Sequence, residues 1–272
     1  MRFLIAALAA LPFLSCAPAP PLRVESKPAV AEKPTAAAPA TPATPASAPR
    51  FTRQEISGVT FEGVAFDSRN HRLVVADQAN GPGSQFADAT AAGNAHGGIA
   101  AVNAGFFTPE GTPLGLVVSA GKTTGSWNST SSLGSGVWFE ETSGQSAISR
   151  REKLGRTAAS SMRELIQAGP LLVENGQPVS GLETTKASAR IVVLWDGGTR
   201  WWIGRGSPCS LAALGQALAN AQPAGWKTRH ALNLDGGRSA DLWVSGAISG
   251  GPFVSRPPWN RPVRNFLVLV AK

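Results

Sequence analysis

The segment "LNLDGGRSA", residues 232–240, gathers polar side chains of the kinds that catalyse hydrolysis. Asn233 and Asp235 alternate with leucines, so in an extended chain an amide and a carboxylate point to the same side of a largely apolar strand. The glycines that follow can bring main-chain N–H groups close to a ligand, and Arg238 and Ser239 come directly after them. N–H donors beside a guanidinium suit an anion. The segment therefore predicts a site for an anionic substrate, with Asp235 as its carboxylate.

A second Asp-Gly-Gly, in "LWDGGTRWW" at residues 194–202, serves as an internal comparison. Asp-Gly and Gly-Gly between apolar runs are strong signals for a hairpin turn, because glycine adopts positive φ without steric cost. At the position that corresponds to Asn233 this copy has Leu194, so it lacks the polar cluster. We therefore interpret Asp196 as a turn residue and Asp235 as a functional one.

A second candidate segment, "VNAGFFTPEGTPLG", covers residues 102–115. Asn103 follows apolar residues and is costly to bury unless it is hydrogen-bonded, and Gly105 permits a close approach of the main chain to a ligand. Two interpretations stay open: both residues bind substrate, or the Asn103 amide bonds its own loop. Glu110 and Asp67 are reserve carboxylates, with the alternative that each is a solvated loop residue.

The elements that must position these residues are mostly strands. Short apolar runs alternate with Gly, Asp or Asn, which predicts a β-rich α+β domain of mixed or antiparallel sheets and argues against Rossmann and TIM-barrel folds. We expect a hairpin joining residues 58–67 to 71–77 and another within 189–204. Helical spacing predicts two helices, one over 157–169 and one over 211–221 with Ser210 as its N-cap.

The first fifty residues differ in composition from the rest. Residues 1–16 hold a basic residue and an apolar run shorter than the roughly 20 residues that span a bilayer, which predicts a secretory signal. Cys16 follows Leu-Ser as in a lipobox, so we expect lipidation there, with ordinary cleavage near "CAPA" as the alternative. Residues 17–50 are rich in Pro, Ala, Thr and Ser and predict a disordered tether, which leaves 51–272 as one domain. These features predict an exported protein of the cell envelope or periplasm, held at a membrane by its lipid alone.

The charge and cysteine content exclude several classes of protein. The formal charge of +8 is spread along the chain, and no nucleic-acid-binding motif is present, so we expect anionic envelope polymers rather than nucleic acid as partners. Cys209 is the sole cysteine of the domain, which excludes an internal disulfide, and we expect it to be buried and unreactive. Three histidines and one cysteine do not readily build a structural zinc site. We expect no cofactor, while a bound divalent metal stays open.

Several segments together resemble the phosphodiester glycosidase family, in order and over most of residues 60–270. They are "VNAGFF", "TPLGLVVSAGK", "QAGPLLVENG", "SARIVVLWDGG", "SLAALGQAL", "ALNLDGGRSADLWV" and "RPVRNFLVLV". The first and the sixth are specific in combination. The sequence departs from the family in Ala104, where Gly is usual, and in Arg238, where a small residue is common. The second departure bears on what fits beside Asp235.

The resemblance implies hydrolysis of the bond between an anomeric carbon and a phosphodiester oxygen, in an envelope glycan or glycolipid. It implies Asp235 as the catalytic carboxylate and Arg190 as a phosphate ligand, with Arg238 as a second one. The other substrate-binding residues that it implies are Asn103, Gly105, Asn233, Gly236, Gly237 and Ser239. Two alternatives stay open: a non-catalytic lipoprotein that binds anionic polysaccharide, and a phosphodiesterase that cuts the P–O bond.

Overall fold

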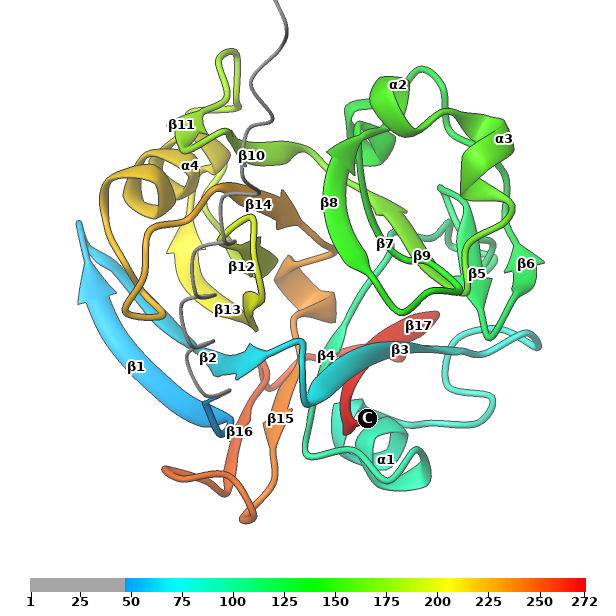
Figure 1. Cartoon of the computed structure of the whole chain (residues 1–272), viewed down its shortest axis with the longest axis horizontal. Helices are drawn as coiled ribbons and strands as arrows, with labels where there is room; N and C mark the ends of the chain where they lie inside the picture. Colours follow the sequence, from blue (N-terminus) through cyan, green and yellow to red (C-terminus); the bar gives the residue numbers. More distant parts are fainter. Residues whose placement is uncertain (1–46) are drawn as a thin grey trace, which may run out of the picture. The chain divides into compact units, whose positions relative to one another are not determined.

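The computed structural model describes residues 47–272, which form three antiparallel sheets (Figure 1). Sheet I has the order β1-β2-β13-β12-β14-β10-β11, sheet II the order β16-β15-β4-β17-β3, and sheet III the order β6-β5-β9-β7-β8. The predicted β-rich α+β class is therefore confirmed. Cys16 and residues 1–46 of the predicted signal and tether lie outside the described residues.

The strands of sheet I are β1 (Arg50–Ile56), β2 (Val59–Asp67), β10 (Leu171–Glu174), β11 (Gln177–Pro178), β12 (Ser188–Trp195), β13 (Arg200–Cys209) and β14 (His230–Asn233). Those of sheet II are β3 (His71–Asp77), β4 (Ala100–Asn103), β15 (Leu242–Val244), β16 (Phe253–Ser255) and β17 (Asn265–Ala271). Sheet III contains β5 (Val117–Ser119), β6 (Lys122–Thr124), β7 (Gly136–Glu140), β8 (Ser146–Arg150) and β9 (Glu164–Ala168). The α-helices are α1 (Ala89–Ala95), α2 (Arg151–Leu154), α3 (Arg156–Ala159) and α4 (Leu211–Asn220), and 3-10 turns cover Ser132–Gly134 and Gly237–Ser239.

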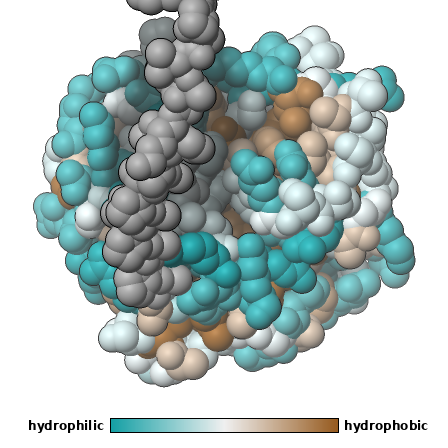
Figure 2. Space-filling model, in the orientation of Figure 1, coloured by the Kyte–Doolittle hydropathy of each residue, from teal (hydrophilic) through white to brown (hydrophobic). Residues whose placement is uncertain are grey.

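One apolar core joins the three sheets. Its buried members include Val64 of sheet I, Val102 of sheet II and Ile166 of sheet III. A second cluster lies between sheet I and α4, where Leu214 and Leu218 are fully buried. In Figure 2 hydrophilic and weakly hydrophobic residues dominate the visible face, and apolar ones occur in small groups. Burial of apolar area therefore holds the sheets together.

The predicted helix α4 and the hairpin over 189–204 are confirmed. The Ser210 hydroxyl accepts a hydrogen bond from Ala213 N at 3.2 Å, as an N-cap does, and the helix ends one residue before the predicted end. Strands β12 and β13 pair antiparallel across the Asp196 turn. Among residues 47–272, no helix has the length and apolar character needed to cross a membrane.

The predicted helix over residues 157–169 is wrong. Only Arg156–Ala159 is helical, and Glu164–Ala168 forms β9, the middle strand of sheet III, all of it buried. The strand reads Glu-Leu-Ile-Gln-Ala, and an apolar run as short as Leu165-Ile166 fits a helix as well as a strand. The helix α1 was not predicted.

The predicted hairpin between residues 58–67 and 71–77 is also wrong, although both strands exist. Strand β2 pairs with β1 and β13 in sheet I, whereas β3 pairs with β17 in sheet II. The short turn at residues 68–70 therefore passes the chain from one sheet to another. Strand β1, which begins at Arg50, pairs with β2 in place of the predicted partner β3.

Candidate active site

Asp235 lies just beyond the end of β14, with 7% of its surface exposed. Its Oδ1 accepts a hydrogen bond from Gly236 N at 2.9 Å. Its Oδ2 has no hydrogen-bond partner within residues 47–272, and the nearest cation to it is Nη2 of Arg261, 3.8 Å away. A buried carboxylate oxygen without a partner is costly, which is a common feature of functional sites.

Burial raises the pKa of the Asp235 carboxyl above its ordinary value. The nearby Ser239 hydroxyl, the charge of Arg261 and the N–H of Gly236 each oppose this rise in part. The carboxyl therefore gains and loses its proton nearer to neutrality than an exposed aspartate does. A general base or acid benefits from such a shift.

Arg261 was not predicted as a site residue, yet it is the arginine that the fold brings to Asp235. Its Nε donates to the Ser239 hydroxyl at 3.1 Å, and its guanidinium lies 4.7 Å from the ring centre of Phe107. This cation–π contact fixes the plane of the guanidinium. The available signal was the charged residue at the head of "RPVRNFLVLV", to which no role had been assigned.

Asn103 binds main chain at both of its amide atoms. Its Nδ2 donates to the Asp235 carbonyl at 2.7 Å, and its Oδ1 accepts from Asp241 N at 2.9 Å. Asp235 N in turn donates to the Ala104 carbonyl at 2.8 Å. Asn103 therefore holds the Asp235 loop at its two ends, which supports the interpretation of a loop-bonded amide and makes Asn103 a positioning residue.

Gly105 is held in the same region by a close contact with β17. Its N–H donates to the Asn265 side-chain oxygen at 2.7 Å, and a Cβ at this position would lie 3.3 Å from that oxygen. The absence of a side chain at Gly105 thus permits the close approach.

Among the described residues, the Asn233 side chain makes no hydrogen bond to the Asp235 side chain. The strand ends at Asn233, so the alternation that placed the two side chains on one side stops there. Asn233 Nδ2 donates instead to the Gly169 carbonyl at 2.8 Å. Its buried Oδ1 has no partner within the described part of the chain.

Gly236 and Gly237 are required by close packing on the start of β12. A Cβ on Gly236 would lie 2.3 Å from the Ala189 carbonyl oxygen, and Gly237 has a φ of +60° with the Ser188 hydroxyl 3.0 Å from its Cβ position. The first contact leaves no room for a side chain, and at Gly237 the positive φ strains any residue that carries one. The turn therefore needs glycine at both positions, as the sequence indicated.

Arg190 and Arg238, the two predicted phosphate ligands, have different surroundings. Arg190 donates to the Cys209 carbonyl at 3.1 Å and to the Lys186 carbonyl at 2.8 Å, and burial lowers its pKa. Within residues 47–272 it has no hydrogen bond or ion pair to Asp235, and its role as a phosphate ligand stays a prediction. Arg238 is exposed, and its Nε lies 3.4 Å from the Trp259 carbonyl.

Asp196 has the contacts of a turn residue. Its carboxylate accepts hydrogen bonds from Gly198 N at 2.8 Å and Arg200 N at 3.1 Å, and pairs with Arg200 Nε at 2.7 Å. The Asp67 carboxylate is bound by Arg69, whose hydrogen bonds lower its pKa. Glu110 is exposed, with its pKa lowered by Thr108. These carboxylates all have local partners, whereas Asp235 is buried with its Oδ2 lacking one within residues 47–272.

Two further expectations concern thiols and metals. Cys209 is free and buried, and burial raises the pKa of its thiol, as the predicted unreactive cysteine requires. Among the described residues no group of three or more His, Cys, Asp or Glu side chains is placed to hold a metal ion.

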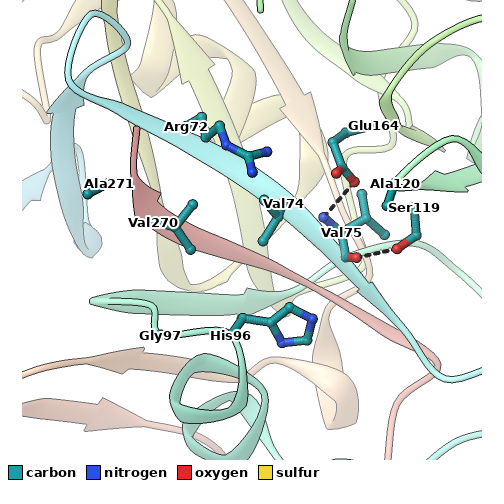
Figure 3. A pocket seen from close by; sticks show the side chains of 10 residues that line it. All are labelled: Arg72, Val74, Val75, His96, Gly97, Ser119, Ala120, Glu164, Val270 and Ala271. Carbon is teal, nitrogen blue, oxygen red and sulfur yellow. Dashed lines mark hydrogen bonds between the residues drawn. The ribbon is translucent and has the colours of Figure 1, made fainter. Parts of the chain in front are cut away.

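A separate cavity of about 490 Å³ lies between β3, β17 and sheet III (Figure 3). The Glu164 carboxylate accepts a hydrogen bond from Val75 N at 3.0 Å, and the Ser119 hydroxyl donates to Val75 O at 2.6 Å. In Figure 3 both side chains reach the main chain of β3 from sheet III. Glu164 thus ties two sheets together, which is a structural role.

We expect Glu164→Gln to raise the free energy of unfolding at pH 8 relative to the parent, by on the order of 1 kcal/mol. Burial raises the pKa of Glu164, against the opposing influence of Arg72. The fold therefore favours the protonated form, and that stabilisation is present below the unfolded pKa and is lost as pH rises through the folded pKa. Glutamine keeps an acceptor for Val75 N without the charge. Denaturant titrations at pH 4 and pH 8 measure the effect, and an equal difference at both pH values would contradict it.

The family profile described as phosphodiester glycosidase matches residues 96–270, more than half of the chain. The catalytic domain of zebrafish N-acetylglucosamine-1-phosphodiester alpha-N-acetylglucosaminidase, solved in a form auto-inhibited by its pro-peptide, has a similar fold. The TM-score is 0.56 at 16% identity, over 86% of each chain.

Two bacterial structures are also similar. A Synechocystis protein has a TM-score of 0.52 at 18% identity, over 85% of this chain and 64% of its own. A Burkholderia pseudomallei protein has a TM-score of 0.52 at 13% identity, over 78% of this chain and 74% of its own. Comparison with curated protein sequences finds no match. At these identities the structures show the fold, and the profile shows the family. This chain belongs to the phosphodiester glycosidase family.

Proposed function

We propose that this protein is a hydrolase that cleaves the bond between the anomeric carbon of a sugar and the oxygen of a phosphodiester. The observation that carries the proposal is the buried Asp235 carboxylate, whose Oδ2 has no hydrogen-bond partner in the described structure and faces the half-exposed guanidinium of Arg261. A carboxylate and an adjacent cation, open to an incoming group, suit a substrate that develops positive charge at carbon beside a negative phosphate.

The leaving group explains why one carboxylate suffices. Ordinary glycosidases use two carboxyl groups, because an alkoxide leaves poorly unless an acid protonates it. A phosphate monoester has a second pKa of about 6, so it departs near neutral pH without a proton. The nearest second carboxylate along the loop, Asp241, already accepts a hydrogen bond from Ala89 N at 2.8 Å and lies 3.4 Å from Arg256. Its Oδ1, like Oδ2 of Asp235, has no hydrogen-bond partner within residues 47–272, but Asp241 is only 1% exposed and this oxygen faces Arg256, so we assign it a structural role.

The proposed reaction is a hydrolysis at the anomeric carbon. The bond from the anomeric carbon to the phosphate oxygen breaks, and its electron pair stays on the phosphate, next to Arg261. The oxygen of a water molecule bonds to the anomeric carbon and its proton passes to Asp235, whose raised pKa suits it to receive that proton. Arg261 offers guanidinium donors beyond the one bound to Ser239, so it can hold phosphate oxygens as their charge grows.

We propose an envelope glycan or glycolipid as the source of the sugar-1-phosphodiester, because the sequence indicates export and a lipid anchor at Cys16. The zebrafish protein of similar fold is named for a substrate with N-acetylglucosamine. That name supports the type of bond and gives a first sugar to try. Anionic substrates also suit the formal charge of +8.

The bond that breaks is decided by hydrolysis in ¹⁸O water. We expect the label in the released sugar, because Asp235 activates water toward the anomeric carbon. Mass spectrometry of both products measures it. Label in the phosphate monoester would instead show a phosphodiesterase that cuts the P–O bond. Tight binding of an anionic polysaccharide without any turnover, over a panel of sugar-1-phosphodiesters, would favour the non-catalytic binding lipoprotein.

A further inference from the structure

A cavity of about 440 Å³ adjoins the Asp235 loop on the side of Gly237. Its lining contains three arginines and no acidic residue, together with the prolines and the tryptophan of the 256–259 segment. The arginines are Arg205, Arg238 and Arg256. A lining of this composition carries positive potential into a concave surface, which attracts anions.

The three arginines are not equally available to a ligand. Arg256 pairs with Asp88 at 2.7 Å and lies 3.4 Å from Asp241. Arg205 lies 3.7 Å from Glu62. Arg238 has no ion pair with any residue from 47 to 272 and is exposed, so its charge is the most available of the three.

Trp259 is the most exposed of the large apolar side chains in the described structure, at 64%. It lines the cavity together with Ser188 and Ala189 of β12. Nothing in the fold of residues 47–272 uses this ring: it does not belong to an apolar cluster. Exposed tryptophan beside polar groups is typical of binding surfaces, where one ring face covers an apolar face of a ligand.

The cavity and the candidate active site share their walls. The Arg238 carbonyl accepts hydrogen bonds from Asn260 Nδ2 at 3.0 Å and Arg261 N at 3.2 Å. Arg238 and Trp259 therefore line the cavity on the same two segments, 237–239 and 257–261, that place Ser239 and Arg261 at Asp235. The cavity therefore adjoins the candidate active site, although Asp235, Ser239 and Arg261 are not themselves part of its lining.

We propose that this cavity is a subsite for a further anionic sugar unit, so that the protein acts on an oligomeric phosphodiester glycan in preference to a small phosphodiester. This rests on the proposed function. Arg238 supplies the charge for a second phosphate or acidic group, and Trp259 covers the apolar face of a sugar ring. The cavity volume of about 440 Å³ suits such a ligand, because cavities of about 300–1,000 Å³ are typical of small-molecule sites.

The test compares two substrates of different length: methyl N-acetylglucosamine-1-phosphate, and a tetramer of N-acetylglucosamine joined by 1-phosphodiester bonds. We expect the parent to have the higher kcat/KM for the tetramer, and Trp259→Ala to lower the tetramer-to-monomer ratio about tenfold, as for the loss of one central aromatic contact. Val254→Ala is the matched control, since Val254 is 50% exposed and outside the cavity lining, and it keeps the ratio. Arg238→Gln lowers the ratio more at low salt than at high salt, because exposed charges are screened.

The outcomes separate this inference from the proposed function. If the parent hydrolyses both substrates and every variant has the parent's tetramer-to-monomer ratio of kcat/KM, the subsite is overturned and the hydrolase remains. A parent that hydrolyses neither of these nor any other member of the sugar-1-phosphodiester panel overturns the hydrolase, and calorimetry with the tetramer then decides the subsite alone. In that case weaker binding by Trp259→Ala than by Val254→Ala supports it, and equal binding overturns it.

Discussion

Asp235→Asn lowers the turnover of a sugar-1-phosphodiester at least about 10²-fold, the low end of the loss expected for a general base. An amide in place of the carboxylate can neither take a proton from water nor stabilise a cationic anomeric centre. The Oδ1 that accepts the Gly236 N–H is retained in asparagine, so the turn keeps its hydrogen bond. Steady-state assays on purified protein with matched far-UV circular dichroism measure the effect.

We expect Asp235→Asn to lose activity without losing stability. Burial raises the pKa of Asp235, so the fold favours its protonated form, and this stabilisation disappears as pH rises through the folded pKa. Asparagine carries no charge to bury, and we expect the free energy of unfolding at neutral pH to stay within about 1 kcal/mol of the parent or to exceed it. Loss of activity without loss of stability distinguishes a catalytic carboxylate from a structural one.

The control is Asp196→Asn, which changes the same residue in the same Asp-Gly-Gly sequence. Its carboxylate accepts hydrogen bonds from the Gly198 and Arg200 main chain, as a turn residue does, and asparagine retains an acceptor for them. We expect near-full activity from this variant. If both variants turn over substrate at the parent rate, Asp235 is only a turn residue, and Glu110 and Asp67 become the carboxylates to examine.

The contrast between the two Asp-Gly-Gly segments could be predicted because it depends on neighbours in sequence. Leu194 and Asn233 differ in polarity at matching positions, and the structure shows one carboxylate bonded within its own hairpin and the other buried with an oxygen unsatisfied. The hairpin of β12 and β13 was predictable for the same reason, since its turn and strands are contiguous.

Pairing between distant segments could not be predicted. The apolar pattern of β3 shows that it is a strand, but the choice between β2 and β17 as its partner depends on how three sheets share one core. Likewise β9 reads as a helix until it is placed between β5 and β7, where both of its faces are buried.

Arg261 could not be predicted for the same reason, because it reaches Asp235 through contacts between distant segments. Arg190 was chosen from its place in a motif, and its role as a phosphate ligand stays a prediction; in the fold its guanidinium donates to two main-chain carbonyls. Arg261 lies 26 positions after Asp235 and reaches it only because the 257–261 segment folds back on the Arg238 carbonyl. Charge alone does not distinguish the two residues in the sequence, whereas burial and partners do.

Arg261→Gln lowers kcat/KM for the sugar-1-phosphodiester about 10–100-fold, the range expected when a hydrogen bond to a charged group is lost. Glutamine can still reach Ser239 but has no charge for the phosphate. Arg200→Gln is the control, because Arg200 is a similarly exposed arginine that pairs with Asp196 at the hairpin turn. Parent-like kcat/KM in Arg261→Gln would show that the phosphate is held elsewhere.

The pH dependence of the same variant separates two roles of Arg261. The proposed mechanism requires an ionised Asp235, so we expect kcat/KM to rise with pH through the pKa of the free enzyme, which burial places above the ordinary aspartate value of about 3.9. The positive charge of Arg261 lowers that pKa in part, so its removal raises the pKa and moves the acid limb of the profile to higher pH. A residue that only bound phosphate would lower kcat/KM equally at every pH. A profile from pH 4 to 9 therefore shows whether Arg261 also sets the protonation of Asp235, and an unshifted limb would restrict its role to binding.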